Sequence, residues 1–210
     1  VEEGIERART EGWDRDEWER LSGLAELGAE LPASRPGCGS LSVDPEHALD
    51  LAVRFGADTM KSRRVKFASQ EDEMEAAFER GWTDGLPVVP PTERRVLAML
   101  QGTRRKPDEV VAVVPPDLVE CTVEKVAINA VLAGCKPEYF PVVLAAVDVV
   151  VDPSFGIHAV MATTMGGTPI FVVNGPIREQ IGMSCGVGAM GPHNHANATI
   201  GRAYGLLSQN

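Results

Sequence analysis

The sequence lacks several features that would assign it to a familiar class of protein. No apolar run approaches the roughly 20 residues that span a bilayer, so the sequence predicts no transmembrane helix. No two of its four cysteines have C-x-x-C spacing, which favours free thiols in a cytoplasmic protein over a disulfide framework. It also lacks the Gly-Lys-Ser/Thr step of a P-loop and any visible internal repeat. The acidic start, Val-Glu-Glu-Gly, indicates neither a secretory signal nor a transit peptide.

Basic residues are outnumbered, and charge of either sign is scarce in the second half. The 20 lysines and arginines face 30 aspartates and glutamates, and the net charge of −10 argues against a nucleic acid or an anionic membrane as partner. Residues 1–35 carry ten acids and five bases, whereas residues 110–210 carry seven acids and four bases. We therefore expect a charged, helical N-terminal region over residues 1–80, and over residues 81–210 an α/β domain whose apolar residues are buried in its core.

Apolar spacing and capping signals predict helices through most of the chain. Asp44 and Pro45 are typical of an N-cap and a first helical residue, Thr92 of an N-cap, and Gly134 of a helix end. The expected helices cover residues 13–31, 44–55, 69–81, 92–101, 122–133 and 137–151, and a last one begins at about Asn194. A proline-rich connection, residues 81–92, separates the third helix from the fourth.

Three short segments rich in β-branched residues are predicted to be strands: 110–114, 156–163 and 169–174. Strands and helices then alternate in the second half, which favours a mixed α/β layered fold behind the helical N-terminal extension. Three strands are few for so apolar a sequence. We therefore expect the sheet to be completed by another protein chain or by a part of the protein beyond residue 210.

The segment 182–202 is the most informative part of the sequence. Four glycines precede the last predicted helix, and glycine permits a positive φ and a close approach of the backbone to a ligand. The helix start beyond them offers free N–H groups and a positive dipole end to an anion. We predict a site here for a small anionic substrate of the carboxylate type. Its expected contacts are Gly186, Gly188, Gly191, Asn194, Asn197 and Arg202.

Cysteine and histidine supply the candidate catalytic groups. Cys185 lies in the glycine-rich turn just before a helix start, where the pKa of a thiol is lowered, although a buried apolar role is the alternative. His193 or His195 would be its acid–base partner. Cys135, at the end of a predicted helix, is a second candidate thiol. The two histidines, with His158, could instead bind a metal, but in a helical turn two such side chains diverge by about 200°.

Other polar residues have both a binding and a structural interpretation. Asp84, in the proline-rich connection, could be a carboxylate that the loop holds rigidly at a pocket to bind the substrate, or it could close an Asx turn. Asn174, at the end of a predicted strand, could bind a ligand or shape a turn. Arg202 could pair with the anion or with Glu179. Glu124 lies in a charge-poor helix, where a buried carboxylate needs a partner and an exposed one complements the helix dipole.

Four segments carry a resemblance to a known family. They are Gly81-Trp-Thr-Asp-Gly-Leu-Pro-Val-Val-Pro-Pro-Thr-Glu93, Val126-Ala-Ile-Asn-Ala-Val-Leu-Ala-Gly-Cys-Lys-Pro-Glu-Tyr139, Asn174-Gly-Pro-Ile-Arg178 and Ala196-Asn-Ala-Thr-Ile-Gly-Arg202. Over residues 78–205 the chain resembles poorly characterised bacterial proteins that occur with, or fused to, domains bearing a Sec/Cys-Gly-Ser-Cys (UGSC) motif. The tetrad itself is absent, since Cys38-Gly-Ser-Leu41 lacks its last cysteine. The resemblance implies a bacterial enzyme subunit with thiol-linked or redox chemistry and a longer natural protein.

Three hypotheses for function follow. The first is a subunit or processed fragment of a cytoplasmic bacterial enzyme, a lyase, hydrolase or thiol-dependent enzyme that acts on a small carboxylate at the glycine-rich turn. The second is a metalloenzyme whose ligands are His193, His195 and a cysteine. The third is a non-catalytic subunit of a hetero-oligomer, in which the proline-rich connection and the apolar helix at 138–151 serve assembly. The sequence indicates no particular cofactor.

Overall fold

The computed structural model describes residues 49–53, 60–67, 70–114, 119–164, 167–191 and 193–210. These residues all belong to the compact unit that begins at Pro45. Residues 49–53 are helical, inside the helix predicted for 44–55. The helix predicted for 13–31, the caps proposed at 44 and 45, and Cys38 lie outside the described residues.

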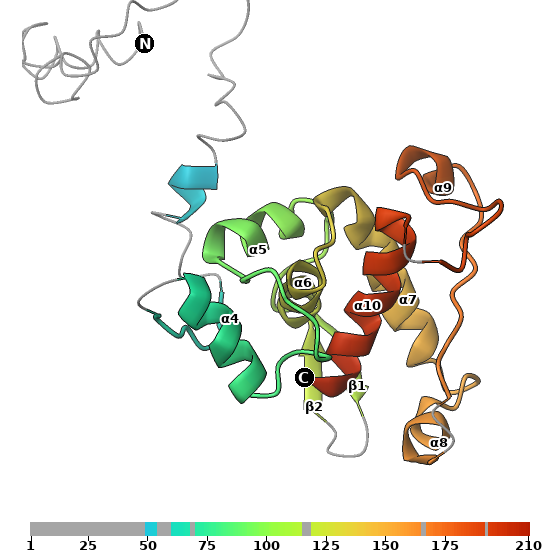
Figure 1. The fold of residues 1–210 in the computed structure, drawn as a ribbon, viewed down its shortest axis with the longest axis horizontal. Coiled ribbons are helices and arrows are strands. Elements are labelled where there is room, and N and C mark those ends of the chain that lie inside the picture. The colour runs from blue at the N-terminus through green and yellow to red at the C-terminus, as the bar shows by residue number, and fades with distance from the viewer. Residues whose placement is uncertain (1–48, 54–59, 68–69, 115–118, 165–166, 192) are drawn as a thin grey trace, which may run out of the picture. The chain divides into compact units, whose positions relative to one another are not determined.

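Helix α6 (Val123–Leu132) lies at the centre of the fold (Figure 1). The hydroxyl oxygen of Thr122 accepts a hydrogen bond from the backbone N–H of Lys125, and Gly134 takes a φ of 87° just beyond the helix. The predicted helix 122–133 and its end at Gly134 are confirmed. Its inward side chains are wholly buried: Val123, Val126, Ala127 and Ala130.

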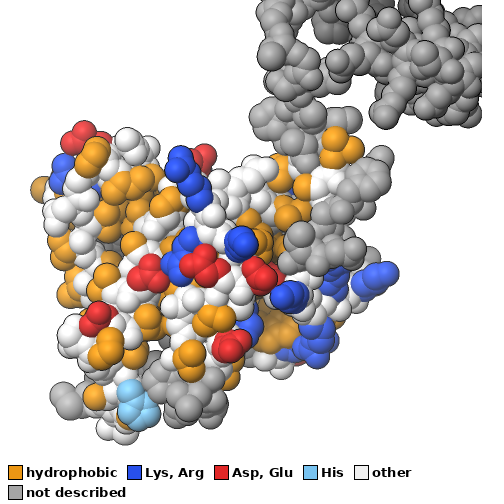
Figure 2. All heavy atoms as spheres, turned by 180° about the vertical axis from the view of Figure 1, so that it is seen from behind, with side chains coloured by type: hydrophobic (Ala, Val, Ile, Leu, Met, Phe, Trp, Pro, Cys, Tyr) orange, Lys and Arg blue, Asp and Glu red, His pale blue; other side chains and the backbone are white. Residues whose placement is uncertain are grey.

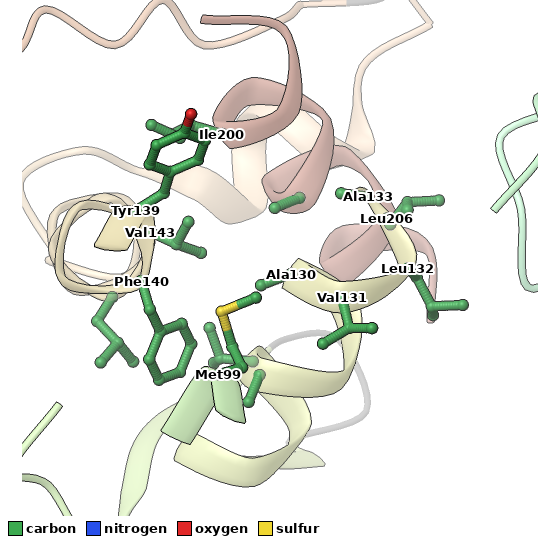
Figure 3. Close-up of a cluster of buried hydrophobic side chains, with 14 of the residues drawn as sticks. Met99, Ala130, Val131, Leu132, Ala133, Tyr139, Phe140, Val143, Ile200 and Leu206 are labelled. Carbon is green, nitrogen blue, oxygen red and sulfur yellow. The ribbon is translucent and has the colours of Figure 1, made fainter. Parts of the chain in front are cut away.

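Three further helices pack against α6. They are α5 (Glu93–Leu100), α7 (Phe140–Val150) and α10 (His195–Gln209), and the short 3-10 helix η2 (Pro137–Tyr139) leads into α7. Figure 3 shows the side chains that fill the space between them, labelled Met99, Ala130, Val131, Leu132, Ala133, Tyr139, Phe140, Val143, Ile200 and Leu206. The helices predicted for 92–101, for 137–151 and from Asn194 are therefore confirmed. No helix among the described residues is long and apolar enough to cross a membrane.

The sheet among the described residues is a two-stranded antiparallel hairpin. Strand β1 (Val110–Val114), which was predicted, pairs with β2 (Val119–Thr122), which was not. Ala112 lies opposite Cys121, and both side chains are buried, so one face of the hairpin packs inward. With its helices, the domain has a mixed α/β composition.

Two of the three predicted strands are wrong. Residues 156–163 contain helix α8 (Ile157–Ala162), which follows Gly156 at a φ of 66°. Its sequence includes two alanines and a methionine, which favour a helix where no neighbouring strand holds the backbone extended. Residues 169–174 pair with neither described strand and lead into α9 (Ile177–Gln180). The strand pairing that the prediction assumed is missing from the described residues.

The segments that precede α5 are attached to the core through both hydrophobic and polar contacts. Helix α4 (Gln70–Glu79) was predicted, and its Ala77 belongs to the same hydrophobic core as α6. Glu124 is only 4% exposed, and its carboxylate accepts hydrogen bonds from the backbone N–H groups of Lys61 and Ser62 at 3.0 and 2.9 Å. A buried carboxylate in this charge-poor helix thus has the partner that physical chemistry requires.

Candidate functional site

The glycine-rich turn, defined here as residues 182–193, is held against the start of α10 by the side chain of Asn194. Its oxygen accepts a hydrogen bond from the backbone N–H of Asn197 at 3.0 Å, so Asn194 is the N-cap of the helix. Its amide nitrogen donates to the carbonyl oxygen of Gly182 at 2.9 Å. The sequence predicted this residue as a substrate contact. In the structure, however, both the oxygen and the nitrogen of its side-chain amide form hydrogen bonds within the protein.

Asn197 anchors the turn at two further points. Its side-chain oxygen accepts from the backbone N–H of Ser184 at 3.1 Å. Its amide nitrogen donates to the carbonyl oxygens of Ser184 and Ala189 at 3.0 and 2.9 Å. These three bonds satisfy much of the hydrogen-bonding capacity of the amide. Asn197, also predicted as a substrate contact, therefore positions the turn and has little capacity left for a ligand.

Two glycines of the turn make room for the ring of His193. Gly188 has a φ of 80°, and a β-carbon there would lie 2.4 Å from Cε1 of His193. A β-carbon at Gly191 would lie 3.2 Å from Nδ1 of the same ring, whereas one at Gly186 would meet nothing within 4 Å. The sequence predicted that Gly188 and Gly191 leave room for a ligand. In the structure, the ring of His193 occupies that room. The turn is open at Gly186, as it is at Gly182.

The spacing of Gly186, Gly188 and Gly191 is that of the dinucleotide fingerprint G-x-G-x-x-G. In that motif the glycines follow a strand and open a helix, so that the pyrophosphate meets the helix N-terminus. Here the preceding element is the short helix α9, and α10 begins only at His195. The local structure therefore differs from the dinucleotide motif despite the matching spacing.

The three described cysteines have different environments. Cys185 is exposed on the glycine-rich turn. Cys121 is buried in the hairpin, and this burial raises the pKa of its thiol. Cys135 is half-buried and donates a hydrogen bond from Sγ to the carbonyl oxygen of Thr199 at 3.3 Å, while burial raises its pKa to about 11. Cys185 is thus the accessible thiol of the three, and Cys135 is poorly suited to act as a thiolate.

His195, the first residue of α10, lies beside a residue that the sequence did not single out. Its Nδ1 is 3.3 Å from the hydroxyl oxygen of Tyr139, and the two ring centroids are 5.6 Å apart. The hydroxyl of Thr199, one turn further along α10, donates to the carbonyl oxygen of His195 at 2.8 Å. The same Thr199 carries the carbonyl that Cys135 contacts. The predicted catalytic residues therefore form two groups: Cys185 and His193 lie on the turn, whereas His195, in α10, and Cys135 are both linked to Thr199.

Arg202 and Asp84, both predicted as substrate contacts, bind each other. The guanidinium donates from Nε to Oδ2 at 2.9 Å and from an Nη to Oδ1 at 2.8 Å. The same Nη donates to the carbonyl oxygens of Leu86 and Pro87 at 3.2 and 2.9 Å. The hydrogen bond from Arg202 lowers the pKa of the Asp84 carboxyl. Arg202 thus fixes the proline-rich connection to α10, and the alternative pairing with Glu179 is wrong.

The remaining candidate, Asn174, is exposed and ends the segment before α9. Gly175 follows it with a φ of 91°, which fits the turn-forming interpretation. Among the described residues, no group of three or more histidine, cysteine, aspartate or glutamate side chains could hold a metal ion.

No protein-family model, curated protein or solved structure matches the chain. The resemblance to the UGSC-associated proteins therefore stays a prediction. The chemistry of the site itself is therefore the basis for its function. The glycine-rich turn carries the exposed thiol of Cys185 and the exposed imidazole of His193. Hydrogen bonds from Asn194 and Asn197 hold this turn against the start of α10.

Proposed function

We propose that this chain is the thiol-bearing subunit of a cytoplasmic bacterial enzyme that acts on a small carboxylate at the glycine-rich turn. The observation that carries the proposal is the position of Cys185, an exposed thiol on a turn that Asn194 and Asn197 fasten to the start of α10. A nucleophile needs such a fixed and accessible position. The positive end of the helix dipole favours both a thiolate and a carboxylate nearby.

The described residues suggest distinct roles in this proposal. Cys185 is the nucleophile or acid–base group, and the exposed ring of His193 accepts or returns the proton. The carboxylate would lie at the start of α10, where the first N–H groups have no acceptor within the helix. Arg202 supports the site from a distance by holding the proline-rich connection. The same groups serve a lyase, a hydrolase or a thiol-transfer enzyme.

Two alkylating reagents test the proposal without knowledge of the substrate. Iodoacetate carries a carboxylate, iodoacetamide is its neutral analogue, and both alkylate a thiolate with loss of iodide. We expect the rate ratio of iodoacetate to iodoacetamide at Cys185, followed by peptide mass spectrometry, to exceed that of a small neutral thiol. Added acetate should reduce the advantage. A ratio at or below the reference, as the net charge of −10 alone would produce, overturns the proposal.

A matched pair of glycine variants locates the effect. Gly188→Ala places a β-carbon 2.4 Å from the His193 ring, so the turn that carries Cys185 has to shift relative to the start of α10, and the rate ratio should fall. Gly205→Ala, in α10, would place its β-carbon in open space and should leave the ratio unchanged. If both variants behave like the parent protein, the turn does not bind the carboxylate and the site is wrongly placed.

A further inference from the structure

The segment Thr168–Asn174 has the exposure pattern of a strand although it pairs with no strand. Exposure alternates strictly along it: the residues at even positions are exposed and those at odd positions are half-buried. Phe171 packs edge-on against the ring of Tyr204 with centroids 5.4 Å apart, and Val173 lies against the hydrophobic core. A period of two is that of an extended strand with one face on the core. Figure 1 shows this segment as the long connection between α8 and α9.

The backbone of this segment is unpaired. Among the described residues, none makes a hydrogen bond to a backbone group of residues 168–174. Its central residues are Ile, Phe, Val and Val, which favour strands. An extended, apolar edge with free N–H and C=O groups is a template for pairing with another strand, and proteins usually protect such edges with charges or bulges. The segment itself contains no charged residue.

Proline shows which of the two edges can pair. In a strand, the N–H and C=O groups of alternate residues point to opposite edges. The edge formed by the even-numbered residues 168, 170, 172 and 174 has a donor at every position. The opposite edge lacks the donor of Pro169, and proline in a strand is confined to positions that face away from the ladder. The even-numbered edge is therefore complete.

The segment and its neighbours along the chain are apolar and exposed. The four most exposed large hydrophobic side chains of the described residues all lie between residues 170 and 190: Ile170 at 70%, Val172 at 79%, Val187 and Met190. Figure 2 shows hydrophobic side chains gathered on the side of the molecule that carries α8 and α9. Between Asp152 and Arg178 the sequence has no aspartate, glutamate, lysine or arginine. Two copies of a chain with a net charge of −10 would repel each other least here.

We propose that a second copy of this chain pairs with the segment 168–174 as an antiparallel strand, across a two-fold axis. The even-numbered edges face each other, so Ile170 of one copy lies opposite Val172 of the other, twice over. Such an interface is self-complementary, and pairs of β-branched side chains directly opposite each other stabilise a sheet. The strand predicted at 169–174 would thereby find its partner in a second copy of the chain, in a two-stranded ribbon separate from the β1–β2 hairpin.

The test measures the oligomeric state of the full 210-residue chain by sedimentation equilibrium. We expect a reversible dimer whose dissociation constant rises at least about tenfold in Val172→Lys, because the lysine enters an apolar strand pair. Val149→Lys, at an equally apolar position on α7 that is 60% exposed, should leave the dimer intact. Circular dichroism and thermal melting show whether each variant is folded.

A mixing experiment tests the register. Ile170→Lys and Val172→Glu should each weaken the dimer, whereas an equimolar mixture of the two should form a heterodimer, because the lysine of one copy then faces the glutamate of the other. A parent chain that stays monomeric overturns the proposal, whether or not a different protein covers the segment. A dimer that Val172→Lys leaves unchanged, or a mixture that does not associate, also overturns it.

Discussion

The ion pair between Asp84 and Arg202 joins the proline-rich connection to α10, and Asp84→Asn tests how much it stabilises the fold. The pair is bidentate, with N–O distances of 2.9 and 2.8 Å. The side chains are 32% and 20% exposed, so solvent screens the attraction in part. A fully exposed pair contributes at most about 1 kcal/mol, and bidentate geometry adds to that. We expect the free energy of unfolding at pH 7 to fall by about 1–2 kcal/mol.

Urea unfolding followed by circular dichroism measures this loss, and the chain provides a matched control. Asp50 and Arg94 approach only to 3.7 Å, and both side chains are more than half exposed. Asp50→Asn makes the same chemical change in a weak surface pair and should alter the free energy of unfolding by less than about 0.5 kcal/mol. Equal effects of the two substitutions would refute the role assigned to the Asp84 pair.

The pH dependence gives an independent check. The hydrogen bond from Arg202 lowers the pKa of Asp84 below its ordinary value of 3.8. A carboxyl whose pKa is lower in the folded state stabilises the protein above its unfolded pKa, and loses that contribution as the pH falls through its folded pKa. The stability difference between the parent and Asp84→Asn should therefore be constant from neutrality to about pH 5 and should shrink below pH 4. A difference that vanishes between pH 7 and pH 5 would contradict this assignment.

Four other substitutions, one of them a control, test the turn and the core. Gly188→Ala places a β-carbon 2.4 Å from the ring of His193 at a residue whose φ is 80°. Its free energy of unfolding, measured by thermal melting, should therefore fall by about 1–2 kcal/mol. The control Gly186→Ala should change stability little, because its β-carbon meets no atom within 4 Å. Asn197→Ala removes three hydrogen bonds and should lower the free energy of unfolding by about 2 kcal/mol in urea. Glu124→Gln weakens the acceptor for two backbone N–H groups, so limited proteolysis should cut residues 60–67 faster; an unchanged rate would contradict that role.

Helices could be predicted well because their signals are local. Thr122 before α6, Gly134 after it and Asn194 before α10 act on backbone groups within a few residues. Strands were predicted poorly for the opposite reason. The segment 169–174 has the β-branched residues of a strand, and the exposure of its side chains alternates as in a strand. A strand forms only where another strand pairs with it, and the sequence of the segment does not identify that partner.

The sequence by itself determined where glycines and polar residues concentrate, where the main core helices form, and that a cysteine lies in the glycine-rich turn, whereas the structure showed that this cysteine is exposed. Only the tertiary structure decided what those residues contact. Arg202 meets Asp84 across 118 residues of chain, and His195 meets Tyr139 across 56. Capping and periodicity depend on neighbours within one or two helical turns, so they can be read along the chain. Polar partners at such separations are set by which segments the burial of the core brings together, and no local pattern encodes that choice.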